Sequence, residues 1–112
     1  MSKREPSILL EDIRVAISKI ERYIAGLDQQ AVLVDEKTSD AVIRNLEIIG
    51  EAVKQPPKDF KIQHATLPWT QVAGLRDRIV HDYAGIDLKL VWHIIKTALP
   101  EFERQISELK ES

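Results

Sequence analysis

Apolar residues recur every three or four positions along most of this chain, which is the period of an α-helix. No stretch alternates apolar and polar residues as a half-buried β-strand would. The clearest run predicts a helix over about residues 7–27. Its apolar positions are Leu10, Ile13, Ile17, Ile20, Ile24 and Leu27. The spacing therefore predicts an all-α fold.

A short helical turn or two is expected over residues 28–34, and a second long helix follows it. This helix should begin near Ser39 or Asp40, because either side chain could accept a hydrogen bond from the free amides of a first helical turn. Pro56-Pro57 should end it, since proline cannot continue a helix.

Residues 58–68 are polar and mixed, and we expect a loop there with a short helix around Phe60. A third main helix should begin near Pro68, since proline is favoured in the first turn. It should end at Ala84-Gly85, because glycine tolerates the left-handed conformation that closes many helices.

Asp87 is expected to cap a fourth helix, which should run to Ala98 and be kinked or restarted at Pro100 before an apolar stripe that reaches Leu109. These segments predict an up-and-down bundle of four to five helices with short connections. With 112 residues, the chain should form one domain over residues 1–112.

The composition excludes several classes of function. The chain has no cysteine, so disulfides, thiolate catalysis and cysteine-based zinc sites are excluded. Its three histidines are too scattered for a standard metal site, and we expect no metal or cofactor. No apolar run approaches the roughly 20 residues of a membrane span, which favours a soluble, cytoplasmic protein without a membrane partner. With a net charge of −2, any contact with RNA must come from a local basic patch.

The segment that holds Arg76, His81 and Tyr83 has the strongest potential for chemistry. The guanidinium of arginine suits phosphate, and the proton of histidine moves near neutral pH. On an ideal helix, Arg76 and His81 would lie about 140° apart. They could converge if the arginine bends round, if the helix loosens near His81, or if two copies meet across a dimer axis. An ordinary helix surface would also account for these residues.

A second polar surface is predicted on the helix that follows Ser39. Arg44, Glu47 and Glu51 are spaced to lie on one side of this helix, and Asn45 adjoins them. Gly50 costs about 1 kcal/mol relative to alanine within a helix, which suggests close helix packing there. A solvated charged face with weak ion pairs is the alternative interpretation.

The chain resembles the HepT branch of the HEPN domains, which are small helical toxins of prokaryotic toxin–antitoxin pairs. The resemblance covers nearly the whole chain and rests on three blocks in the right order. The blocks are Ala41–Ala52, then Leu67–Trp69 with Ala73–Asp77, then Ile79–Tyr83 with Gly85–Leu88 and Val91–Trp92.

This resemblance implies a metal-independent endoribonuclease, the toxin of a type VII toxin–antitoxin pair, that cleaves RNA without a cofactor. It implies a homodimer in which the Arg-x4-His motifs of two subunits, here Arg76 and His81, face one cleft. It further implies that a partner nucleotidyltransferase antitoxin, which could form a larger hetero-oligomer with the toxin, transfers AMP to Tyr83. Ala84 departs from the aromatic residue that relatives often carry.

Two other interpretations remain open from the sequence. The chain could be a non-catalytic HEPN-type module that binds nucleotide or RNA, or that docks a nucleotidyltransferase. It could also be a plain helical oligomer without a site. The intact arginine, histidine and tyrosine favour the enzyme.

Overall fold

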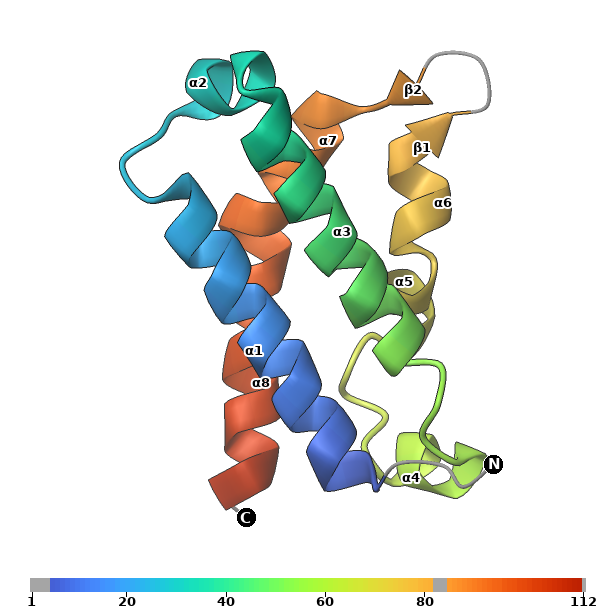
Figure 1. Cartoon of the computed structure of the whole chain (residues 1–112). Coiled ribbons are helices and arrows are strands. Elements are labelled where there is room, and N and C mark those ends of the chain that lie inside the picture. The colour runs from blue at the N-terminus through green and yellow to red at the C-terminus, as the bar shows by residue number, and fades with distance from the viewer. Residues whose placement is uncertain (1–4, 82–84, 112) are drawn as a thin grey trace.

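The computed structural model describes residues 5–81 and 85–111, and it confirms the all-α prediction apart from one very short β-pair. Figure 1 shows the arrangement of its helices. In chain order the elements are α1 (Pro6–Ile24), α2 (Gln29–Val34), α3 (Glu36–Ala52), α4 (Lys58–Gln63), α5 (Trp69–Ala73), α6 (Leu75–Ile79), β1 (Val80–His81), β2 (Gly85–Ile86), α7 (Leu88–His93), the π-helix η1 (Ile94–Ala98) and α8 (Leu99–Glu111).

Three long helices, α1, α3 and α8, form the body of the bundle, and α1 packs against both of the others (Figure 1). Their apolar stripes meet in a core whose burial stabilises the fold by the hydrophobic effect. Side chains that are at most 2% exposed come from all three helices. They include Ile13, Ile17, Ile20, Leu46, Ile49, Phe102 and Ile106. Within the described ranges, no helix combines the length and the apolar character needed to cross a membrane.

The first two helices agree with the sequence prediction except at one end. Helix α1 ends at Ile24, three residues before Leu27, because the chain turns at Gly26, whose φ of 77° lies in the left-handed region. The short helix expected over 28–34 is α2, and the Asp28 side chain caps it by accepting a hydrogen bond from the Ala31 amide at 2.8 Å.

The predicted start of α3 at Ser39 or Asp40 is wrong, because Asp35 caps this helix. The Asp35 carboxylate accepts hydrogen bonds from the Thr38 hydroxyl at 2.8 Å and from the Thr38 amide at 3.3 Å. These bonds lower the pKa of Asp35. The Ser39 hydroxyl instead donates to the Val32 carbonyl at 2.7 Å, and so fixes α2 to α3. The predicted end of the helix, before Pro56-Pro57, agrees with its last residue, Ala52.

The predicted third helix is wrong as one continuous element. The short helix around Phe60 exists as α4, but the segment after Pro68 forms two short helices, α5 and α6, that meet at Gly74. Helix α6 ends at Ile79, well before Ala84-Gly85. Ile79 and Val80, where the helix gives way to β1, are both β-branched and so favour extended backbone.

That extended backbone is the small antiparallel pair. Val80 pairs with Ile86, and His81 pairs with Gly85. The φ of Gly85, 79°, is a conformation that glycine adopts without strain. The amide of Asp87 donates to the Ile79 carbonyl at 2.7 Å, and this bond holds the strand pair to the end of α6.

The C-terminal part confirms its predicted cap and its predicted change at Pro100. The Asp87 carboxylate accepts from the Leu90 amide at 3.1 Å and caps α7. Leu99 alone separates the π-helix η1 from Pro100. Proline has no amide to donate to the carbonyl four residues earlier, that of Lys96, and its ring crowds that carbonyl. The wider π-turn accommodates the ring, and α8 then continues to Glu111.

Candidate functional site

The Arg-x4-His segment crosses a change of secondary structure. Arg76 belongs to α6 and His81 to β1, and the helix ends at Ile79, between them. The angle of about 140° expected for a continuous helix therefore does not apply. Of the three possibilities raised by the sequence, the structure has the one in which the helix ends before His81. For Arg76 and His81 it describes the backbone, and Tyr83 lies outside the described residues.

Buried side chains on both sides of Arg76 hold this segment in place. Leu75 is 3% exposed and Ile79 is fully buried, and α6 packs against both α3 and α7. His81 pairs with Gly85 in the two-stranded sheet, one residue after the pair of Val80 and Ile86. The backbone around the motif is therefore fixed by a helix packed on the core and by the strand pair that follows it.

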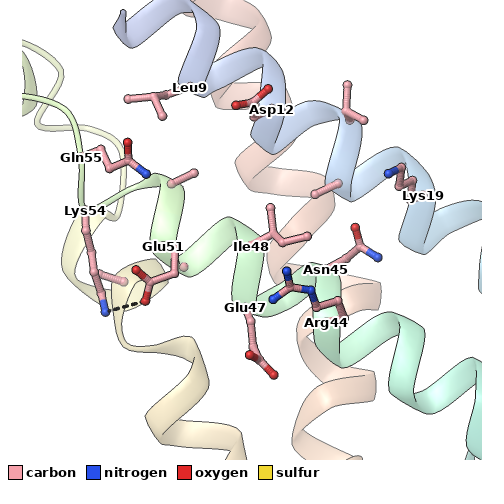
Figure 2. Close-up of a pocket in the computed structure, with 15 residues that line it drawn as sticks. Leu9, Asp12, Lys19, Arg44, Asn45, Glu47, Ile48, Glu51, Lys54 and Gln55 are labelled. Carbon is pink, nitrogen blue, oxygen red and sulfur yellow. Dashed lines mark hydrogen bonds and ion pairs between the residues drawn. The ribbon is translucent and has the colours of Figure 1, made fainter. Parts of the chain in front are cut away.

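A groove of about 540 Å³ lies on the outer face of α3, bounded by α1 on one side and by Ala73 of α5 on the other. All four residues of the predicted polar surface line this groove: Arg44, Asn45, Glu47 and Glu51. Figure 2 shows them along one helix, with Asn45 directed towards α1 and Glu47 on the side away from it. The structure thus brings these four residues together.

The four polar residues differ in their surroundings. Asn45 is only 6% exposed, and its amide donates to the Ala41 carbonyl at 2.9 Å, so it serves the helix itself. Glu51 forms an ion pair with Lys54 at 3.3 Å, with both side chains largely exposed. Such a pair contributes little to stability. Arg44 is exposed and Glu47 half-buried, which leaves a guanidinium and a carboxylate facing the groove.

The sequence did not reveal the other side of the groove. Asp12 and Lys19 of α1 also line it, together with the exposed Val15. These residues lie outside the apolar stripe predicted for this helix, and no local signal pairs their side of α1 with α3. Charges of both signs therefore line the groove, with Asp12, Glu47 and Glu51 against Lys19, Arg44 and Lys54.

Gly50 allows α3 and α5 to approach each other closely beside the groove. A Cβ atom at this position would lie 3.4 Å from the Val72 carbonyl oxygen and 3.7 Å from that of Ala73. The close packing suggested by a glycine within a helix is therefore present, between α3 and the backbone of α5. Ala73, which lines the groove, lies three residues before Arg76 in the sequence.

The histidines outside the motif lie apart from the groove. His64 is half-buried, with its ring 4.5 Å from that of Phe60, and His93 is exposed on α7. Among the described residues, no group of three or more histidine, aspartate or glutamate side chains is arranged to hold a metal ion.

Comparison with known proteins gives a consistent result. Residues 13–109 match the sequence model of the family described as ribonuclease HepT-like. A protein of Thermococcus cleftensis named "Probable ribonuclease HepT" is 41% identical over 108 residues, which cover 96% of this chain and 98% of that protein. A protein of Caldanaerobacter subterraneus, named provisionally as an RNase, is 35% identical over 106 residues, 95% of each chain. A protein of Methanocaldococcus jannaschii, also named provisionally as an RNase, is 36% identical over an alignment of 115 positions that covers 99% of each chain. No solved structure matches the chain.

Proposed function

Because this chain belongs to the HepT-like ribonuclease family, we propose that it is an endoribonuclease whose Arg76 and His81 act directly on the phosphodiester. The observation that best supports this choice of residues is the end of α6. Helix α6 ends between them, so one side chain starts from a helix and the other from the strand that directly follows it. They are thereby released from the fixed spacing that would separate them on a continuous helix.

The proposed reaction uses the RNA's own 2′-hydroxyl and needs no metal ion. The 2′-oxygen attacks the adjacent phosphorus, the bond from phosphorus to the 5′-oxygen breaks, and a cyclic phosphate and a 5′-hydroxyl result. A histidine can take the proton from the 2′-hydroxyl, and a second can give one to the departing 5′-oxygen. The guanidinium of Arg76 stabilises the negative charge that develops on the phosphoryl oxygens.

One copy of the chain supplies one His81, so we propose that the active form is a homodimer. Two copies related by a two-fold axis would bring two histidines and two arginines to one cleft. The groove on α3 carries charges of both signs, so two copies of it can pair opposite charges across an isologous contact. In such a contact, Arg44 of each copy can face Glu47 of the other.

We propose that the chain is the toxin of a type VII toxin–antitoxin pair, silenced when a nucleotidyltransferase antitoxin transfers AMP to Tyr83. In this transfer the phenolic oxygen of Tyr83 attacks the α-phosphorus of ATP and pyrophosphate leaves. The attached AMP would place bulk and a negative charge two residues from His81. RNA phosphate would then be repelled and excluded from the cleft.

The direct test is cleavage of a labelled RNA by the purified protein and by its His81→Ala variant. We expect the variant to lose at least about a hundredfold in rate, the usual contribution of a general acid–base group. The wild-type rate should persist in excess chelator, and DNA of the same sequence should survive because it lacks the attacking hydroxyl. Undiminished cleavage by His81→Ala would remove His81 from the mechanism. A wild-type protein that binds RNA without cutting it would point to a non-catalytic module.

A further inference from the structure

A row of exposed basic side chains follows the strand pair on α7 and η1. Lys89, His93 and Lys96 are all exposed. The spacing of four residues places Lys89 and His93 on one face of α7, and Lys96 follows in the π-helix η1. We call these three residues the α7 stripe. Residues 88–100 contain no aspartate or glutamate, so every ionisable side chain of the segment is basic.

The carboxylates near the stripe come from neighbouring elements. Helix α2 packs against α7 and has no charged residue in its sequence. Helix α6 also packs against α7 and carries Asp77, and α8, which packs against η1, carries Glu101 in its first turn. Asp87 caps α7, and Glu21 lines a hollow of about 290 Å³ together with Lys96. The segment of the stripe itself contains no acidic residue, whereas acidic and basic residues lie together in the α3 groove.

An aromatic ring holds one end of the stripe in place. The Lys96 ammonium lies 5.3 Å from the centre of the Trp92 ring, and Trp92 is half-buried against the core. This cation–π contact keeps the Lys96 charge near the helix surface instead of far out in solvent. A phosphate that approaches the stripe therefore meets a positive charge whose position is already restricted.

The stripe begins beside the proposed catalytic residue. His81 pairs with Gly85 across the two strands, and Asp87 alone separates β2 from α7. Figure 1 shows α7 leading away from the strand pair into the bundle. Lys89 lies near this origin, and His93 follows about 6 Å further along the helix axis.

We propose that the α7 stripe binds the phosphate backbone of single-stranded RNA beside the cleavage point. The inference rests on the proposed function, because it takes His81 as the place where the strand is cut. A chain of net charge −2 needs a local positive surface to hold RNA, and this stripe supplies one that continues from the motif. Recognition would be of phosphate, so it would not depend on base sequence and would weaken with salt.

The test measures binding of a fluorescent single-stranded RNA with 2′-O-methyl groups, which cannot be cut because it lacks the attacking hydroxyl. We expect Lys89→Glu and Lys96→Glu each to weaken binding about three- to tenfold at low salt. The Lys89→Gln/Lys96→Gln double variant should reduce the slope of log affinity against log salt by about 1.4, or about 0.7 for each lost phosphate contact. With cleavable RNA, KM should rise and kcat should be retained, because the stripe does not touch the reacting atoms.

The matched control is Lys58→Glu, with Lys58→Gln for the salt series. Lys58 is an exposed lysine at the start of α4, at the opposite end of the molecule from the strand pair (Figure 1). Lys58→Glu carries the same change in net charge as each single Lys→Glu variant of the stripe, and Lys58→Gln carries half that of the double variant. Both should bind RNA as the wild type does. Equal losses in the Lys58 and Lys89 variants would mean a general charge effect and would overturn the proposal.

The outcomes separate this inference from the proposed function. Cleavage that depends on His81, with unchanged RNA affinity and salt slope in the double variant, would refute the stripe and leave the nuclease intact. A wild-type protein that neither binds nor cuts RNA would refute both. Because all three stripe residues are exposed, the variants should keep the wild-type melting temperature, which circular dichroism can verify.

Discussion

Gly50 illustrates how a single position can set the distance between two helices. A side chain larger than methyl would drive its atoms against the carbonyls of Val72 and Ala73, which lie 3.4 and 3.7 Å from the ideal Cβ position. The glycine lowers the intrinsic stability of α3 by about 1 kcal/mol. In return α5 lies directly on α3, and Gly74 alone separates the end of α5 from the start of α6, which carries Arg76. The position of the motif thus depends on a residue that takes no part in its chemistry.

Tyr83 is the residue whose chemistry the proposed regulation requires. We expect Tyr83→Phe to keep ribonuclease activity, because the phenolic oxygen has no part in the proposed cleavage. The variant should escape silencing, since phenylalanine offers no oxygen for AMP transfer. Co-expression with a nucleotidyltransferase antitoxin of the proposed kind, followed by intact mass measurement and an RNA cleavage assay, checks both expectations.

The other tyrosine of the chain supplies the control for this experiment. Tyr23 lies on α1 and is 38% exposed, so it is accessible to a transferase. The Tyr23→Phe variant should still gain the mass of AMP and should still be silenced. If Tyr83→Phe is silenced as fully as the wild type, inhibition by binding alone would replace the proposed modification.

The helices show which parts of a fold local sequence can and cannot determine. Apolar spacing predicted α1, α2, α3 and the C-terminal helices, since each buries one stripe in the same core. It failed where several local choices compete. Residues 35–40 contain four side chains that could cap the helix. Asp35 is the cap, and the Ser39 hydroxyl instead donates a hydrogen bond to the Val32 carbonyl of α2. It failed again at Ile79, where pairing with Gly85 and Ile86 overrides a helical pattern.

The cap of α3 makes a prediction about pH. The Thr38 hydrogen bonds lower the pKa of Asp35 below its ordinary value of 3.8, so the ionised carboxylate is favoured in the folded state. Its contribution to stability is complete above that ordinary value and is lost as the pH falls through the lowered one. We therefore expect the melting temperature of the wild type to exceed that of Asp35→Asn at neutral pH, and the difference to shrink below about pH 4.

Thermal unfolding followed by circular dichroism between about pH 7 and about pH 2 measures this difference. Thr38→Val serves as the control, because it removes the hydroxyl donor, which is the largest cause of the shift, and retains the backbone donor. It should reproduce part of the pH effect. A difference between wild type and Asp35→Asn that stays constant across this range would show that the charge of Asp35 does not stabilise the fold.

The candidate site as a whole was only partly predictable, because it is built from segments distant in sequence. The helical period alone placed Arg44, Glu47 and Glu51 on one face, and the structure has them in one groove. Asp12 and Lys19 could not be found in this way, since the packing of α1 on α3 is a property of the tertiary fold. The way two copies of the chain pack together is even less predictable from local sequence. The proposed dimer is therefore best tested by its activity.

Mixing wild-type protein with the His81→Ala variant tests whether one cleft needs a histidine from each copy. After subunits have exchanged at an equal ratio, about a quarter of the dimers carry two wild-type chains and about half are mixed. If one histidine takes the 2′-proton and the other protonates the 5′-oxygen, mixed dimers are inactive. The activity of the mixture then falls to about a quarter of the activity of the same total amount of wild-type protein. If each chain acts alone, activity falls only to about half. A surface variant such as Lys58→Gln, mixed in the same way, should leave activity unchanged. A linear fall with the fraction of variant would exclude the shared cleft, whereas a quadratic fall requires that two chains contribute to each act of cleavage.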